Sequence, residues 1–219
     1  MDSAQLFRHT SRHGFYRTTL AYSSTALRRL VDVEFMRVYV AEESPTTGPE
    51  AADYVTRCVT DTEYGAGAKA FQGEHQRKWA FDRGDRCFAN FDGDQMVGYT
   101  FYGLHSTVVS DDLEFRFPEK LIYAYASFTQ PAHRGRRLAL ARANMRKFVD
   151  QEAGNERRVV WYVVADDYAA RAAGRLFGGV LVGYLGYAKF RGRTLFFASP
   201  GCKRAGVSLA LSFSPPNAN

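Results

Sequence analysis

Long apolar runs are missing from this sequence. No stretch of roughly 18 consecutive apolar residues, the length that a membrane-spanning helix needs, occurs anywhere in the chain. The first residues, Met1-Asp2-Ser3-Ala4-Gln5, also lack the basic region followed by an apolar segment that marks a secretory signal. We therefore expect no membrane span and a cytoplasmic location.

Cysteine is scarce as well. Cys58, Cys87 and Cys202 are widely spaced and never form a C-x-x-C pair, so the pattern predicts neither a disulfide framework nor a zinc site. An H-E-x-x-H sequence and carboxylates clustered at ligand spacing are absent too. We expect no catalytic or structural metal.

The charge is basic without a long basic run. Twenty-nine Lys and Arg residues oppose 23 Asp and Glu residues, and the net charge of +6 favours an anionic partner such as a nucleic acid or a polyphosphate. The basic residues concentrate at 134–137, where a glycine interrupts them, and no nucleic-acid motif accompanies them. The distribution favours a small phosphate-bearing ligand, and we expect no nucleic-acid partner.

Hydrophobic residues make up 46% of the chain, enough for a substantial core. We expect one domain over residues 1–211, with a strand and helices in 1–85 and the main core in 86–198. The Ser, Pro and Asn residues of 212–219 are typical of a disordered tail.

Hydrophobic periodicity predicts the elements along the chain. In the N-terminal part it favours a strand at 34–41, helices at 25–31, 50–58 and 66–80, and a turn at 42–49. From residue 86 the patterns are clearer, and Asp92-Gly93 between two runs of β-formers predicts a hairpin. The elements expected there are strands at 86–91, 96–104 and 120–129, a polar loop at 110–118, a helix at 138–150, a strand at 157–165, a helix at 168–177, and strands at 180–190 and 194–198.

One segment carries the clearest chemistry. Gln130-Pro131-Ala132-His133-Arg134-Gly135-Arg136-Arg137 joins the predicted strand 120–129 to the predicted helix 138–150. The first turn of a helix has unpaired N–H groups and a positive dipole end, so it can bind a phosphate while arginines add charged hydrogen bonds. A solvated turn is the competing interpretation. The residues predicted to hold a diphosphate are Arg134, Gly135, Arg136, Arg137, Leu138 and Ala139.

This segment resembles the acyl-CoA-binding turn of the GNAT superfamily of N-acyltransferases, which reads [Q/R]-x-x-G-x-[G/A] at a strand-to-helix junction. Arg134-x-x-Arg137-x-Ala139 occupies that frame, with Arg137 in place of the usual glycine. The resemblance implies an α/β fold with a mixed, mostly antiparallel central sheet flanked by helices. It also implies pantetheine pairing along the strand edge at Phe128, Thr129 and Gln130.

The resemblance extends over residues 86–198 and implies an activity. Acetyl-CoA or another acyl-CoA would donate its acyl group to a primary amine by direct transfer in a ternary complex. In the family's second motif, Asp167 stands for the Asn that holds pantetheine, and Gly174 stands for the Tyr that protonates the departing thiolate. Protonation then comes from solvent or another residue, or the domain is a catalytically weak sensor or structural module that binds acyl-CoA.

The predicted central strand offers no carboxylate to act as a base. Strand alternation places Tyr123, Tyr125, Ser127 and Thr129 on one face. Tyr123 precedes Arg134 by 11 residues, the spacing at which some family members carry a catalytic Glu, so it is the candidate catalytic residue. Packing in the core is its competing role.

The partners expected from the resemblance are an acceptor and a donor. The acceptor is a small-molecule or peptide amine, and an acyl carrier protein is an alternative donor to CoA. The sequence does not specify the acceptor, the acyl length or the oligomeric state.

Overall fold

A computed structural model describes residues 32–41, 53–67, 79–110, 112–153, 157–165, 167 and 178–212. The helices predicted at 25–31 and 168–177, the turn at 42–49 and almost all of the tail lie outside these residues. That residues 1–211 form one domain stays a prediction. Within the described part, every helix is too short or too polar to cross a membrane.

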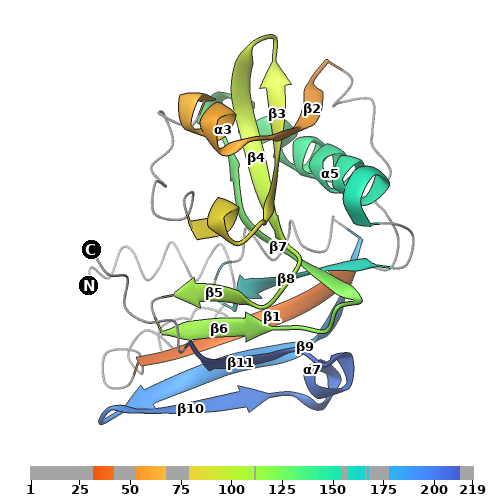
Figure 1. The fold of residues 1–219 in the computed structure, drawn as a ribbon. Helices are drawn as coiled ribbons and strands as arrows, with labels where there is room; N and C mark the ends of the chain where they lie inside the picture. The colour runs from red at the N-terminus through yellow and green to blue at the C-terminus, as the bar shows by residue number, and fades with distance from the viewer. Residues whose placement is uncertain are drawn as a thin grey trace, which may run out of the picture.

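The fold is α/β, with a mostly antiparallel eight-stranded sheet in the order β10-β9-β1-β8-β7-β4-β3-β2. A second sheet, β11-β6-β5, packs in front of the β1, β8 and β9 part of the large sheet (Figure 1). The strands are β1 Asp32–Ala41, β2 Val55–Val59, β3 Arg86–Asp92, β4 Gln95–Gly103, β5 Thr107–Ser110, β6 Leu113–Arg116, β7 Leu121–Thr129, β8 Arg158–Val164, β9 Gly179–Phe190, β10 Arg193–Ala198 and β11 Ser208–Leu211. The helices are α3 Asp61–Gly67, η3 Pro131–Arg136, α5 Arg137–Phe148, η4 Val149–Ala153 and α7 Pro200–Ala205, with a short helical segment at 79–82.

The mixed, mostly antiparallel sheet flanked by helices confirms the predicted fold class. The strand at 34–41, the Asp92-Gly93 hairpin, the central strand and the helix that follows it are also confirmed. Two predictions are wrong. The C-terminal part of the expected helix 50–58 is strand β2, whose β-branched residues pair with β3. The expected polar loop 110–118 contains β6 and the end of β5, because Leu113 and Phe115 alternate with polar residues and face the core.

The large sheet consists of two halves that meet at β7 and β8. These strands run parallel and pair over Leu121–Tyr123 and Arg158–Val160 alone. Beyond Tyr123 the strands diverge, with β3, β4 and β7 in one half and β8, β1, β9 and β10 in the other (Figure 1). Among the described residues, pairing between β7 and β8 does not continue past Tyr123 into the part of β7 from Ala124 to Thr129.

Helices cover opposite faces of the half formed by β2, β3, β4 and β7. On one face Phe148 of α5 stacks on Tyr102 at a centroid distance of 4.1 Å and contacts Phe88. On the other face Tyr64 of α3 packs edge-on against Tyr99 and Phe101. The central residues of β3 and β4 are therefore buried on both faces of the sheet.

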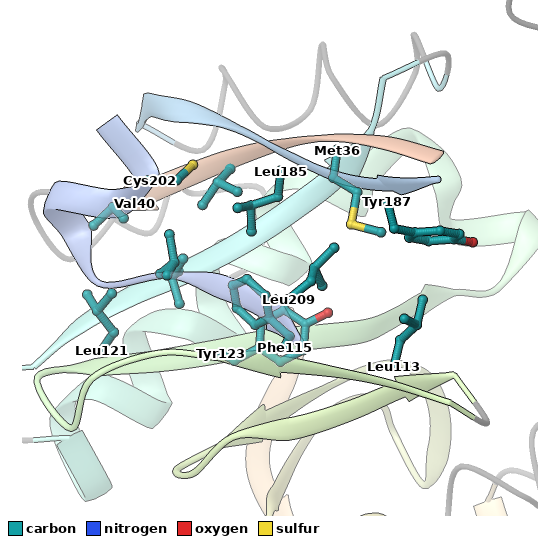
Figure 2. Packing of buried hydrophobic residues seen from close by; sticks show 13 residues of the cluster. Met36, Val40, Leu113, Phe115, Leu121, Tyr123, Leu185, Tyr187, Cys202 and Leu209 are labelled. Atoms are coloured by element: carbon teal, nitrogen blue, oxygen red, sulfur yellow. The ribbon is translucent and has the colours of Figure 1, made fainter. Parts of the chain in front are cut away.

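The other half is buried against the small sheet. Figure 2 shows this core, in which Met36 and Val40 of β1 and Leu185 of β9 face Phe115 and Leu209 of the small sheet. Tyr123 extends this core to the central strand, so the junction between β7 and β8 packs directly against it.

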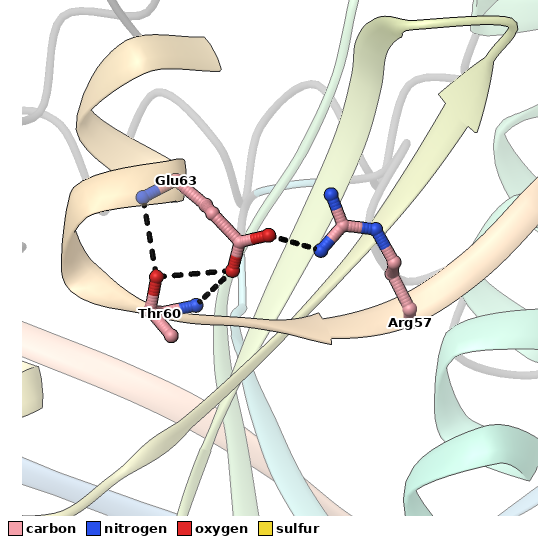
Figure 3. A network of polar contacts seen from close by, with 3 residues as sticks. All are labelled: Arg57, Thr60 and Glu63. Carbon is pink, nitrogen blue, oxygen red and sulfur yellow. Dashed lines mark hydrogen bonds and ion pairs between the residues drawn. The ribbon is translucent and has the colours of Figure 1, made fainter.

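The start of α3 is fixed by a reciprocal capping box (Figure 3). The Glu63 amide donates to Thr60 Oγ1 at 3.3 Å, and the Thr60 amide donates to Glu63 Oε2 at 2.8 Å. Arg57 of β2 donates to Glu63 Oε1 at 2.5 Å. These bonds, led by that from the Thr60 amide, lower the pKa of Glu63 to about 2.

Candidate functional site

The predicted phosphate turn lies at the end of β7, beyond the stretch at Leu121–Tyr123 where β7 pairs with β8. The chain leaves β7 at Gln130, whose side-chain amide donates to Met96 O at 2.7 Å, and enters η3 at Pro131. η3 runs directly into α5, and the Arg137 amide donates to Arg134 O. The turn is therefore a continuous helical segment in which some amides already have partners.

The arginines of the turn differ in their surroundings. Arg136 pairs with Asp53 at 3.4 Å and lies over the Tyr54 ring, while His133 Nδ1 is 3.0 Å from the Tyr54 hydroxyl. Arg134 and Arg137 are exposed, and no ion pair within the described residues holds either of them. These two side chains are the cations of the turn that remain available for an anionic ligand.

An open pocket of about 500 Å³ lies beside this turn. Its lining combines basic and acidic groups with one glycine, and the residues are Asp53, Tyr54, Asp92, Ala132, His133, Gly135 and Arg136. An added Cβ at Gly135 would meet no protein atom within 4 Å, and the backbone there does not require a positive φ. Neither packing nor conformation demands glycine at this position, which leaves room for close approach by a ligand.

The central strand carries a bulge where it borders the opening. Tyr99 pairs with Phe128 and Phe101 with Tyr125, so two residues of β7, Ala126 and Ser127, stand opposite one of β4. Ala126 has φ 47, in the left-handed region that a non-glycine residue seldom adopts. A β-bulge changes the direction of side chains and backbone groups, and bulges are common next to active sites.

The bulge overturns the predicted alternation on this strand. Tyr125 and Phe128 both pack against the aromatic cluster on the α3 face. Ser127 instead bonds to Thr100 at 3.1 Å, on the α5 face. The side chains of Tyr123, Tyr125, Ser127 and Thr129 therefore do not share one face, because the extra residue at Ala126 shifts the alternation by one.

Tyr123, the predicted catalytic residue, is 4% exposed and lies in a stack of three tyrosine rings. Its neighbours are Tyr125 at 5.2 Å between ring centroids and Tyr162 of β8 at 5.7 Å. Burial and the neighbouring Tyr162 raise the pKa of Tyr123 well above its ordinary value. The structure gives Tyr123 a packing position across the β7–β8 junction, and its catalytic role stays a prediction.

Sequence reasoning missed a polar group next to this stack. Asp85, 4% exposed, accepts hydrogen bonds from the Tyr125 hydroxyl and from Arg83 Nη2. Arg83 Nη2 also donates to the Tyr125 oxygen at 3.1 Å. Asp85 lies 40 positions before Tyr125 in the sequence and follows Arg83-Gly84, a pair that matches no functional motif. The one available signal was an acidic residue directly before a strand of β-formers.

The other predicted ligand-binding residues are spread along the site. Phe128 stacks on Tyr99 at 5.9 Å, and Thr129 is buried at the end of β7. Ala139 is buried against Ala143 of the same helix, while the Leu138 side chain lies outside the described residues. Asp167 is exposed just beyond β8, and its amide donates to Val164 O at 3.0 Å. The turn and the β7 edge are thus contiguous, and Asp167 follows the strand on the far side of the opening.

Metal ligation has no structural candidate in the described ranges. No group of three or more His, Cys, Asp or Glu side chains there could hold a metal ion.

No family model matches the chain, and no curated protein matches it. Solved structures similar to it include a GCN5-related N-acetyltransferase from Sphaerobacter thermophilus (15% identity, TM-score 0.49, 77% of this chain and 56% of that one). Another is a functionally unknown conserved protein from Staphylococcus epidermidis, with 15% identity and a TM-score of 0.49 over 74% of this chain and 64% of that one. A third is a tandem GNAT protein from the clavulanic acid biosynthesis pathway, with 14% identity and a TM-score of 0.45 over 89% of this chain and 59% of that one.

The chain spans less than two thirds of the length of each of these proteins. Because identity and TM-score are low, the function must be inferred from the residues of this chain.

Proposed function

We propose that the chain is an acyl-CoA-dependent N-acyltransferase that moves an acetyl or longer acyl group to a primary amine by direct transfer in a ternary complex. The observation that carries the proposal is the opening between β7 and β8, bordered by a bulged strand edge and ending at a basic helix start. An extended ligand with amides in its middle and a diphosphate at one end matches both features.

Each part of the site has a role in this proposal. Arg134 and Arg137 bind the diphosphate through charged hydrogen bonds, helped by the positive dipole end of the helical segment in which they lie. Gly135 gives the ligand close access to the backbone. The edge of β7 at Phe128, Thr129 and Gln130, beyond the residues that pair with β8, offers backbone groups to the pantetheine amides, as an added strand would use them.

The chemistry needs an activated carbonyl, and the bound thioester supplies it. A backbone N–H of β7 near Ala126 polarises the thioester oxygen, since the bulge turns the backbone at this point. The site holds the amine and the thioester together, which converts a bimolecular reaction into one within a complex.

The first test is calorimetric titration of acetyl-CoA and longer acyl-CoAs into the full chain, followed by thiol release with a panel of amines. Binding with release supports the transferase. Binding without release favours the acyl-CoA sensor, and no binding to any acyl-CoA contradicts both. Acyl-loaded carrier protein is assayed as a separate donor.

Paired variants locate the binding. Replacing Arg134 and Arg137 by Ala should raise the CoA dissociation constant at least tenfold, about 1.4 kcal/mol. Replacing the exposed Arg193 and Arg204 by Ala removes the same amount of charge elsewhere on the surface and should change the CoA dissociation constant less than twofold. Equal losses in both double variants would mean that binding follows net charge, without a specific site at the turn.

A further inference from the structure

The Asp85 carboxylate is buried beside the proposed site, while the Asp85 amide ends the helical segment at 79–82 by donating to Ala80 O at 3.0 Å. The carboxylate lies beside β4 at Gly103, where an added Cβ would lie 3.6 Å from Asp85 Oδ1 and 2.7 Å from Thr107 Oγ1. Glycine at this position lets the Thr107 hydroxyl and the Asp85 carboxylate pack closely against β4.

The hydrogen bonds of the group form a closed triangle. Tyr125 donates its hydroxyl proton to Asp85, and Arg83 donates to both partners. Arg83 is itself held flat over the Trp79 ring, 3.7 Å from its centroid. The Tyr125 oxygen therefore has a fixed position and retains one lone pair that can accept a further hydrogen bond.

One donor of the triangle is unused. Arg83 Nη1 is buried and has no hydrogen-bond partner among the described residues. Buried donors are rarely left unpaired, so a specific unpaired one needs an explanation. A polar atom of a bound substrate would satisfy it.

The surroundings of Tyr125 keep its hydroxyl protonated, with the proton donated to Asp85. Burial first, and then the adjacent Asp85 carboxylate, raise the pKa of Tyr125 above its ordinary value. A tyrosine in this state does not ionise by itself, but it can accept one proton while it passes its own to the carboxylate.

Tyr125 is also the tyrosine of the stack that lies next to the opening. It directly precedes the bulge at Ala126, and it is half-buried, whereas Tyr123 is buried behind it. Of the two, Tyr125 is better placed to meet an acceptor.

We propose that Tyr125 and Asp85 form the proton-accepting pair of the transfer, with Arg83 holding both in place, an inference that rests on the proposed function. As the amine nitrogen bonds to the thioester carbonyl carbon, the C–S bond breaks and its electron pair leaves on the thiolate. One N–H proton passes to the Tyr125 oxygen while the Tyr125 proton passes to Asp85. Asp85 returns the proton to solvent, and solvent protonates the thiolate, so the pair is restored.

The test compares kcat with acetyl-CoA binding for variants of the full chain, using an amine that the wild type acylates. Tyr125→Phe should lower kcat by about 100-fold or more, while the dissociation constant of acetyl-CoA changes less than twofold. Asp85→Asn should lower kcat similarly with little change in the amine KM, and Asp85→Glu should restore part of it. Adding Asp85→Asn to Tyr125→Phe should cause little further loss, because the two residues act as a unit.

Tyr102→Phe is the matched control. It also removes a buried hydroxyl from the same part of the sheet, but on the α5 face, and should retain kcat. If Tyr125→Phe keeps more than half of the wild-type kcat, the role of Tyr125 and Asp85 as the proton-accepting pair is contradicted, whereas the proposed transferase activity is not. If Asp85 variants lose thermal stability while the folded protein keeps its kcat, the group is structural. A wild type that binds acetyl-CoA without thiol release overturns the transferase and the pair together.

Discussion

The two halves of the large sheet are assembled in different ways. In the half with β2, β3, β4 and β7, β3 pairs with β4 across a two-residue turn, and helices cover both faces. In the other half β1 lies between β8 and β9, so Met36 pairs with both Val164 and Leu185 from near the other end of the chain. The strands of the first half all lie within residues 55–129, whereas the second half brings β1 together with strands from near the other end of the chain.

The difference shows where a site can form. The halves share three residue pairs between β7 and β8, and beyond these pairs the two strands separate. The turn and the bulge belong to the first half, whereas the second half supplies the opposite wall with Tyr162. A stable opening requires that both halves are rigid, so substitutions in either half should reveal how independently each one is stabilised.

The largest effects should come from truncating one core residue in each half. Phe148→Ala should lower the free energy of unfolding by about 3–5 kcal/mol and Leu185→Ala by about 2–5 kcal/mol, because both side chains are fully buried. Hydrogen exchange should rise in β3 and β4 for the first variant and in β1, β8 and β9 for the second. A uniform rise in both variants would show that the sheet opens as one unit.

Close packing in the second half should make Gly186 intolerant of a side chain. An added Cβ would overlap the Phe197 ring and the Glu34 carbonyl oxygen, and the backbone atom cannot move aside easily. Gly186→Ala should therefore cost about 1–3 kcal/mol in urea unfolding. An unchanged midpoint would mean that β1 and β10 can separate around β9.

Gly135→Ala is the corresponding change in the first half. The added methyl group meets open space, so stability should stay within about 0.5 kcal/mol of the wild type. Acetyl-CoA binding should weaken about fivefold, close to 1 kcal/mol, because the methyl group occupies the approach to the turn. Calorimetry measures this binding, and unaltered affinity would place the ligand away from Gly135.

The smallest effect concerns the capping box at α3 and depends on pH. Because folding lowers the pKa of Glu63 from 4.5 to about 2, its ionised form stabilises the fold above pH 4.5, and that contribution is lost as the pH falls toward 2. Glu63→Gln should cost less than about 1 kcal/mol at pH 7, since the ion pair with Arg57 is exposed. The stability difference between the two proteins should shrink on acidification, and a constant difference would contradict the assignment.

Local signals explain what the sequence could predict. Asp92-Gly93 predicts its hairpin, and Arg191-Gly192, both at positive φ, forms the turn between the two last strands of the large sheet. The basic turn before α5 is likewise a contiguous segment.

Features that depend on distant partners were not predicted. Strand β2 is specified by its pairing with β3, and the small sheet requires β11 to meet β6. The bulge at Ala126 has no glycine to signal it, because tertiary packing imposes the left-handed conformation on alanine. The Asp85–Tyr125 contact depended on both the bulge and the sheet order, so no local pattern could indicate it.

The position of β1 also affects how the protein is made. This strand leaves the ribosome well before β8 and β9, because residues 42–157 lie between β1 and β8 in the chain. At about 5–20 residues per second the delay is on the order of ten seconds. During that time the core around Met36, Val38 and Val40 lacks the residues of β8 and β9, and the strand edges can pair with other nascent chains. Chaperone occupancy on the nascent chain should therefore persist until β9 has emerged.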